Sequence, residues 1–188
     1  MTISSVCCVS ARMGIELPRR VAQGLADHLN GALNRTVTDS RLSVRPIAGY
    51  ADAFRLARIV DGSDVPLELD GQTAWLFAEH VVVVEDEKCR TESYSYRLQA
   101  DPSPGSWLIR WEYVREPPRA EYAYPRAHVH VNGFFADGAP VARVHIATPR
   151  LPLELVVRNL VSDWGVKPRT EDWLPILEDS AKDFGKPN

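Results

Sequence analysis

Three of the five histidines lie close together in two strand-like runs of the sequence. His128 and His130 are separated by one valine, and His145 follows in the next run. Because alternate side chains of a β-strand point to opposite faces, His128 and His130 are expected on the same face. An imidazole has an ordinary pKa of about 6.5, so one ring can accept a proton near neutral pH while another donates one. These residues are therefore the first candidates for chemistry.

The two runs are expected to pair as a β-hairpin, because Asp137-Gly138 between them is a favourable two-residue turn. The predicted cross-strand pairs are His130 with His145, Asn132 with Arg143, Val131 with Val144 and Val129 with Ile146. This register collects the polar side chains on one face and the valines and the isoleucine on the other. A shift by one residue would mix polar and apolar side chains on both faces, so the pattern itself favours this register.

Two histidines and a nearby cation are sufficient for the cleavage of RNA without a metal ion. One imidazole activates the 2′-hydroxyl, the other protonates the leaving oxygen, and an arginine stabilises the negative charge on phosphorus. Arg143 and Arg150 are the nearby candidates for this cation, and Arg150 lies at the start of a predicted helix. In this interpretation His128, His130 and His145 are catalytic, and no cofactor is required.

The same histidines allow two other interpretations. His-x-His together with a third histidine supplies the three ligands of a catalytic zinc site, which keeps its fourth position for water. The metal ligands are then His128, His130 and His145. A solvent-facing strand must also carry polar residues for purely structural reasons, and the two-residue spacing is compatible with that role. The sequence leaves these alternatives open.

A second pair of strands is expected to add charged residues to the same surface. The runs 94–98 and 107–113 can pair through the turn between Pro102 and Gly105. Alternation then assigns these residues to the core face: Tyr94, Tyr96, Leu98, Trp107, Ile109 and Trp111. Arg97, Arg110 and Glu112 project from the opposite face, which is the histidine side if the strands keep their order. The candidates for anion or substrate binding are Arg97, Arg110, Arg143, Arg150 and Asn132, and Glu112 joins the histidines as a catalytic candidate.

The elements that position these residues follow clear periodicities. Apolar side chains recur every four residues between Leu17 and Arg35, which predicts an amphipathic helix with Pro18 near its start. Short β-rich runs separated by turn residues follow at Phe54 to Val60, Val65 to Leu69, Ala74 to Val84, Arg90 to Gln99, Trp107 to Arg115, Ala127 to Phe135 and Val141 to Thr148. Helical spacing returns at Leu153 to Trp164, and a last helix is expected after Thr170.

This order of elements predicts a single α+β domain over residues 1–188. A twisted antiparallel β-sheet meander is expected to pack one face against an N-terminal helix and two C-terminal helices, with its other face open. A chain of 188 residues with 45% hydrophobic content is long enough for one core and too short for two.

Composition excludes several classes of protein. The net charge of -3 argues against a general nucleic-acid coat, although it allows a local basic surface. The sequence has no signal peptide and no apolar stretch approaching the roughly 18 residues of a membrane span, so we expect a cytoplasmic protein without a membrane partner. Cys7, Cys8 and Cys89 fit neither a disulfide framework nor a CxxC metal site.

Residues 79–133 resemble the small bacterial toxins of the TumE type, which belong to toxin-antitoxin modules. The resemblance rests on three segments: Ser93-Tyr94-Ser-Tyr96-Arg97-x-Gln99, Ile109-Arg110-Trp111-Glu112-Tyr113 and Pro125-Arg-Ala-His128-Val-His130. The positions that match the family pattern are Arg110, Glu112, His128 and His130. The resemblance implies an antitoxin as partner, and RNA or the translation apparatus as target.

A non-enzymatic function is the remaining alternative. The open sheet face could bind a protein partner without any chemistry at the histidines. The segment Arg115 to Arg126, which contains three prolines, is a second candidate surface, because long ordered loops are commonly functional.

Overall fold

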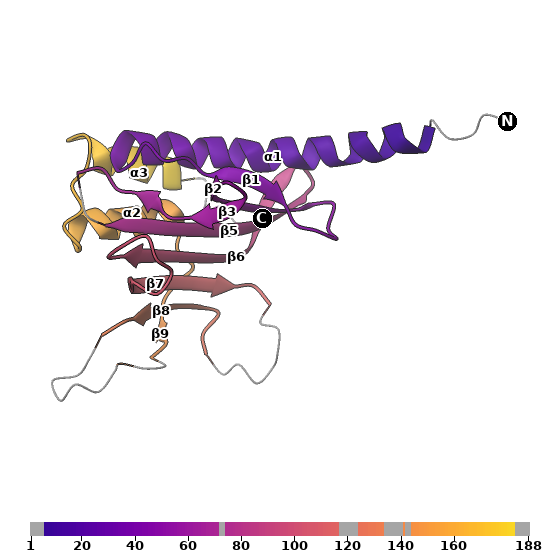
Figure 1. Cartoon of the computed structure of the whole chain (residues 1–188). Helices are drawn as coiled ribbons and strands as arrows, with labels where there is room; N and C mark the ends of the chain where they lie inside the picture. Colours follow the sequence, from indigo (N-terminus) through magenta and orange to yellow (C-terminus); the bar gives the residue numbers. More distant parts are fainter. Residues whose placement is uncertain (1–5, 72–73, 117–123, 134–140, 142–143, 183–188) are drawn as a thin grey trace.

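The computed structural model describes residues 6–71, 74–116, 124–133, 141 and 144–182, and for residues 6–15 it describes the backbone only. Within these ranges the chain forms three helices and a nine-stranded sheet (Figure 1). The helices are α1 (Val6–Thr36), α2 (Leu153–Ser162) and α3 (Trp173–Ala181). The strand pairs are antiparallel, so the predicted α+β class with one N-terminal and two C-terminal helices is confirmed.

The sheet is a meander over most of its width. Its strands are β1 (Ser43–Pro46), β2 (Ala53–Val60), β3 (Ser63–Val65), β4 (Leu67–Glu68), β5 (Trp75–Glu85), β6 (Lys88–Gln99), β7 (Trp107–Val114), β8 (Ala127–Val131) and β9 (Ile146–Ala147). They lie in the order β1-β2-β5-β6-β7-β8-β9, while β3 pairs with β2 and β4 pairs with β5. From β5 to β9 each strand therefore pairs with the next strand in the sequence.

Tight turns set the register of the longest strands. Asp86 and Glu87 join β5 to β6, and both have positive φ angles, 48° and 59°. Asp61 and Gly62, with φ angles of 48° and 81°, join β2 to β3 in the same way. Two consecutive residues with positive φ are typical of type I′ hairpin turns, whose twist matches the right-handed twist of paired strands.

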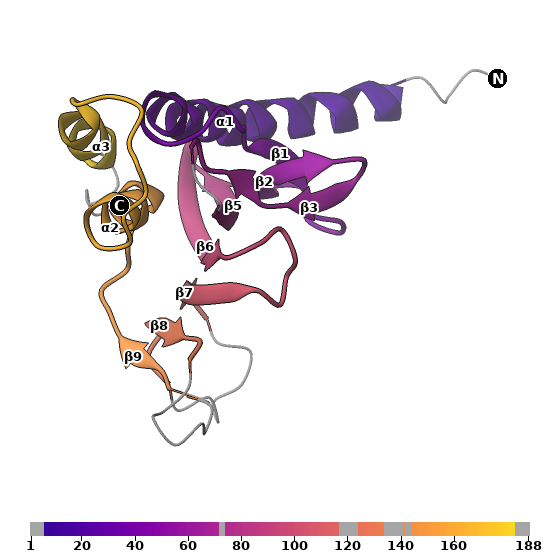
Figure 2. The same cartoon turned by 60° about the vertical axis from the view of Figure 1, so that its left-hand side comes forward.

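The helices cover one face of the sheet, and the core lies between them. Cross-strand rows of buried side chains mark this face, for example Ala78, Tyr96, Trp111 and Val129, which follow one another from β5 to β8. The part of the sheet formed by β7, β8 and β9 extends away from α1 (Figures 1 and 2). Side chains of the intervening positions project from the opposite face, which we call the open face.

The ends of several elements differ from the prediction. The helix α1 begins at Val6 rather than near Leu17, so Pro18 lies inside it. The short strand β1 was not predicted, because it has four residues and ends in a proline, which lowers the strand signal of its sequence. Among the helices of the described ranges, none is long and apolar enough to span a bilayer.

Candidate functional site

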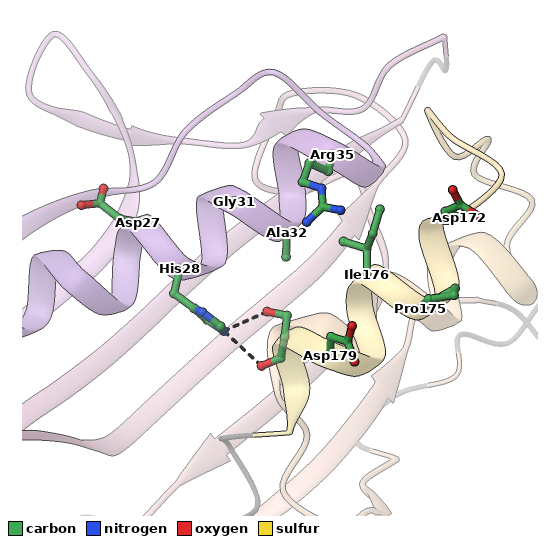
Figure 3. Close-up of a pocket in the computed structure, with 10 residues that line it drawn as sticks. Asp27, His28, Gly31, Ala32, Arg35, Asp172, Pro175, Ile176 and Asp179 are labelled. Carbon is green, nitrogen blue, oxygen red and sulfur yellow. Dashed lines mark hydrogen bonds between the residues drawn. The ribbon is translucent and has the colours of Figure 1, made fainter.

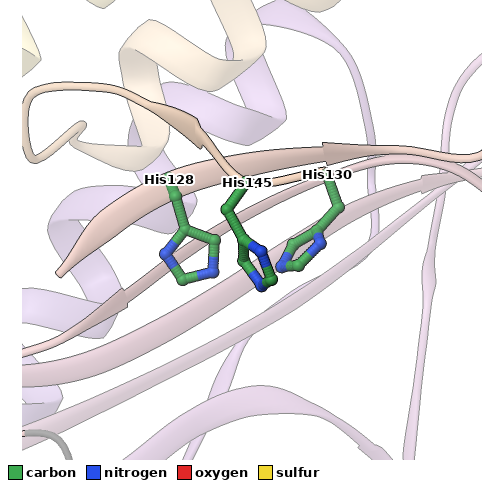
Figure 4. A group of neighbouring side chains, drawn as sticks. All are labelled: His128, His130 and His145. Carbon is green, nitrogen blue, oxygen red and sulfur yellow. The ribbon is translucent and has the colours of Figure 1, made fainter. Parts of the chain in front are cut away.

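The three histidines come together on the open face where β8 meets β9. These strands pair with Val129 opposite Ile146, as predicted, and the same register places His130 opposite His145. The ring centroids lie 4.4 Å apart for His130 and His145, 4.8 Å for His128 and His130, and 4.9 Å for His128 and His145. Figure 4 shows the three rings side by side. Each ring therefore touches both of the others.

The histidine cluster (His128, His130 and His145) has the convergence that a metal ion requires. One nitrogen from each ring can be chosen so that all three lie within 4.8 Å of one another. The side chains of His128 and His130 are 4% and 13% exposed, so water reaches them only in part. The cluster is thus a set of close nitrogen donors at a protected position, rather than three solvated side chains.

A backbone contact fixes the orientation of the His128 ring. Its Nδ1 atom lies 2.7 Å from the carbonyl oxygen of Pro125. A carbonyl oxygen only accepts hydrogen bonds, so Nδ1 carries the hydrogen and donates it. In the neutral ring the lone pair is then on Nε2, which faces the Glu112 side chain at 3.7 Å. Histidines that bind metals are commonly held in one tautomer by this kind of contact.

Tyr124 packs against the histidine cluster. Its place in the site was not predicted from the sequence. Its ring stacks on His145, with centroids 4.6 Å apart and planes 4° from parallel, and meets the edge of His128 at 4.9 Å. Tyr124 and Pro125 lie just before β8, separated from it by Arg126. The prolines of this segment indicated a functional loop, but nothing in the sequence indicated which side chain of the loop contacts the histidines.

Glu112 joins the cluster to the rest of the open face. It pairs with His128 across β7 and β8, and its Oε2 atom lies 3.1 Å from Nε2 of His130. Its Oε1 atom accepts a hydrogen bond of 3.4 Å from the Ser95 hydroxyl. The same carboxylate lies 3.2 Å from Nε of Arg110, although the N–H is not directed at the oxygen. Glu112 is therefore a partly buried anion between imidazoles and a guanidinium.

Arg97 and Arg110 stand directly opposite each other on β6 and β7, and Arg110 stands opposite His130 on β8. The guanidinium of Arg97 lies over the Phe77 ring at 4.7 Å, and that of Arg110 lies over the Trp107 ring at 5.0 Å. One cross-strand row thus runs from Phe77 through both arginines to the histidine cluster.

The position of Trp107 corrects the predicted core face. The β6–β7 register shifts between Leu98 and Gln99, so that Gln99 faces Trp107 while Leu98 faces Ile109. Between these two pairs β7 contains one residue more than β6, which changes the alternation of its side chains. The Trp107 ring therefore contacts Arg110 on the open face instead of joining the core.

Burial controls the protonation of the cluster. Desolvation lowers the pKa of His128, and it outweighs the Pro125 carbonyl and the Glu112 carboxylate, which act in the opposite direction. Desolvation, followed by repulsion from Arg110, lowers the pKa of His130 to about 4. Both rings are therefore neutral at pH 7. Neutral imidazoles are suited to accept protons or to bind a metal, whereas neither ring is a ready proton donor.

Other predicted site residues lie elsewhere. Arg150 was expected on the histidine surface at a helix start, and both expectations are wrong: its guanidinium lies 5.9 Å from the centroid of the Tyr113 ring, on the helix side of the sheet, and α2 begins at Leu153. Asn132 donates a hydrogen bond of 2.8 Å to the Trp107 carbonyl, which ties the end of β8 to β7. Arg143 lies outside the described residues.

A second polar cluster joins the three helices beside a surface cavity of about 570 Å³ between α1 and α3 (Figure 3). The Nε2 atom of His28 lies 3.0 Å from the Ser180 carbonyl oxygen and 2.9 Å from its hydroxyl, which donates to Glu154 at 2.7 Å. Because the carbonyl only accepts, Nε2 is the donor. His28 therefore does not act as a base toward Ser180, and the cluster links the helices.

Comparison of the chain with protein-family models, with curated proteins and with solved structures found no match. The resemblance to TumE-type toxins stays a prediction.

Proposed function

We propose that the protein is a metal-dependent hydrolytic enzyme in which His128, His130 and His145 hold one divalent metal ion. The observation that carries this proposal is the convergence of one nitrogen from each ring within 4.8 Å. The Pro125 carbonyl supports it, because this contact leaves the lone pair of His128 on Nε2.

Zinc fits this donor set best. Zinc binds imidazole nitrogen at about 2.0–2.1 Å, so three tetrahedral ligands lie roughly 3.3 Å from one another. The three nitrogens lie within 4.8 Å of one another, so metal binding would require them to approach by about 1.5 Å. Three histidines also leave the fourth position open for water, which is the usual arrangement of catalytic rather than structural zinc.

The chemistry follows from what surrounds the cluster. A bound zinc ion lowers the pKa of its water to about 7, which supplies a nucleophile at neutral pH. Glu112 lies 3.1 Å from His130 and 3.7 Å from His128, so its carboxylate is close enough to take a proton from a water molecule held there. We assign Glu112 as the general base.

The second candidate is cleavage of RNA by the histidines without a metal ion, as in the toxin-like interpretation. Arg97 and Arg110 favour it, because they supply cations beside His130. It requires one histidine to act as a general acid, and because burial lowers the pKa of His128 and His130, this role would fall to His145. The same residues serve a metal centre without that requirement, so we rank this candidate second.

The metal proposal is tested by metal content. The protein is saturated with zinc, dialysed and measured by elemental mass spectrometry, and we expect about one zinc ion per chain. His130→Ala and His145→Ala should remove it, whereas His28→Gln, which changes a histidine on α1, should keep it. Circular dichroism of each variant checks folding. Folded wild-type protein without zinc, or zinc retained by both cluster variants, contradicts the proposal.

A further inference from the structure

We propose that the substrate of this centre is a phosphate ester, and that Arg97 and Arg110 bind its phosphate group. The reaction rests on the proposed metal centre, but the binding of phosphate rests on the two arginines alone. The inference combines three observations: the placement of the guanidinium groups, their fixed orientation and the free donors that they keep.

The first observation is that two like charges face each other in the sheet. Arg97 and Arg110 are direct cross-strand partners. Like charges directly opposite each other destabilise a sheet. Burial lowers the pKa of Arg97, and repulsion from Arg110 lowers it further. Glu112 and Glu79 act in the opposite direction on Arg97, but the net shift is downward, and an anion between the two guanidinium groups would relieve the remaining repulsion.

The second observation is that neighbouring groups hold both side chains in place. Phe77 and Trp107 stack beneath the two guanidinium groups. Nε of Arg97 donates a hydrogen bond of 3.2 Å to the Ser95 hydroxyl, and Nε of Arg110 lies against Glu112. These contacts orient the guanidinium planes before any ligand arrives, which reduces the entropy lost on binding.

The third observation concerns the terminal nitrogens. In the part of the chain that the structure describes, the polar contacts of Arg97 and Arg110 are made through Nε, and their Nη atoms make none. The nearby carboxylates do not use these donors: Glu112 contacts His130, and Glu79 lies 3.8 Å from Arg55. The terminal nitrogens of two adjacent guanidinium groups therefore remain as donors for an external anion.

Phosphate matches this arrangement better than a carboxylate does. A guanidinium group binds phosphate oxygens in pairs, and two such groups can contact three oxygens of one tetrahedral anion. Arg110 also lies directly opposite His130 on the neighbouring strand, so a phosphate bound by the two arginines would be beside the metal centre. A neutral ester of a carboxylic acid offers no negative charge for Arg97 and Arg110 to bind. The site therefore favours phosphoryl transfer to water.

The proposed step is hydrolysis. The oxygen of a water molecule forms a bond to phosphorus, and the bond from phosphorus to the ester oxygen breaks. Glu112 takes one proton from the water and returns it to the departing oxygen, which leaves as an alcohol. The two arginines stabilise the additional negative charge on the phosphate oxygens during this step.

The binding test uses inorganic phosphate and the metal-free protein in isothermal titration calorimetry. We expect Arg97→Gln and Arg110→Gln each to weaken phosphate binding at least about tenfold, the value of one charge-assisted hydrogen bond. Arg90→Gln is the matched control, because Arg90 lies on the same strand β6 but is paired with Glu85 and Glu92. Arg110→Lys keeps the positive charge but lacks the planar guanidinium that binds two oxygens at once. Its phosphate affinity should lie between those of the wild type and Arg110→Gln.

The activity test uses the zinc-loaded protein and three chromogenic esters. These are bis(4-nitrophenyl) phosphate, 4-nitrophenyl phosphate and 4-nitrophenyl acetate. We expect hydrolysis of a phosphate ester with a KM that rises in both glutamine variants, while Arg90→Gln has no effect. Preference for the diester identifies a diester substrate, and preference for the monoester identifies a terminal phosphate.

The outcomes separate this inference from the metal proposal. Phosphate binding that is absent, or that is unchanged in folded Arg97→Gln and Arg110→Gln, overturns the inference, even if the protein binds zinc. Hydrolysis of the acetate alone also overturns it. Phosphate binding that depends on both arginines, in a protein that binds no zinc, supports the anion site and removes the metal centre.

Discussion

The Nδ1 atom of His128 donates a hydrogen bond to the carbonyl oxygen of Pro125, three residues earlier in the chain. This contact links the segment before β8 to the face on which the histidines converge. Tyr124, next to Pro125, stacks on His145 and so touches the cluster from the other side. The segment that enters β8 is therefore part of the site, and its conformation sets the tautomer of one proposed ligand.

This link predicts that zinc binding depends on a residue that is not a ligand. Pro125→Gly frees the backbone that presents the carbonyl to His128, so zinc affinity should fall about tenfold or more, the range found for lost partners of metal-binding histidines. Competition with a zinc-binding dye measures the change. Pro46→Gly, at the opposite edge of the sheet, is the control and should bind as wild type does. Equal affinities for the two variants would show that the contact does not matter.

A second prediction tests whether Glu112 acts as a general base or as a metal ligand. Glu112→Gln keeps the size of the side chain but removes its capacity to accept a proton, so hydrolysis should fall by about 10²- to 10⁴-fold. Zinc content should remain at the wild-type value, because the three histidines are unchanged. Elemental analysis and initial rates are measured on the same preparation. Loss of zinc together with activity would instead identify Glu112 as a metal ligand, contrary to our assignment.

The register of the histidine strands was predicted from the Asp137-Gly138 turn, which lies outside the described residues, together with the alternation of polar and apolar side chains. Val129 and Ile146 are apolar while His128, His130 and His145 are polar, so a shift by one residue would mix the two sets on each face. The helices were predicted for the same reason, since α2 repeats its apolar positions with helical spacing. Periodicity thus determined the elements and the face on which the histidines lie.

The features that were missed depend on single residues or on contacts between distant segments. The extra residue in β7 that turns Trp107 to the open face has no recognisable signal in the sequence. Arg150 was assigned to the wrong side because the chain leaves the sheet after β9 and crosses to the helix side, where the Leu151 N–H donates to the Tyr94 hydroxyl. Tyr124 reaches the cluster through the fold of a segment that has no periodicity. None of these could be obtained from alternation.

A third prediction concerns the dependence of stability on pH. His80 is buried among Thr91, Tyr94 and Tyr96, and burial, followed by the charge of Arg150, lowers its pKa to about 4. The unfolded chain has a pKa of about 6.5 and so binds more protons between these values, which means that stability falls as pH drops from 6.5 toward 4. The loss between pH 7 and pH 4.5 is about 2–3 kcal/mol for this group.

Urea denaturation of the metal-free protein at both pH values measures this effect, and His80→Gln isolates it. The variant lacks the titrating group, so its loss of stability on acidification should be smaller than that of the wild type by about 2–3 kcal/mol. Other groups titrate equally in both proteins and cancel in the difference. If the two proteins lose the same stability, His80 is not held neutral by burial.

The last prediction concerns the cluster that joins the helices. Glu154 on α2 has a side chain that is only 5% exposed, and the Ser180 hydroxyl on α3 donates to it at 2.7 Å. Ser180→Ala leaves this buried carboxylate without that donor and deprives His28 of one acceptor, so the free energy of unfolding should fall by about 1–3 kcal/mol. Urea denaturation measures the loss, with the exposed Ser63→Ala on β3 as the control. Because the cluster lies on the helix side of the sheet, zinc and phosphate binding in folded Ser180→Ala should equal those of the wild type. A change in either would show that the helix layer and the open face are coupled.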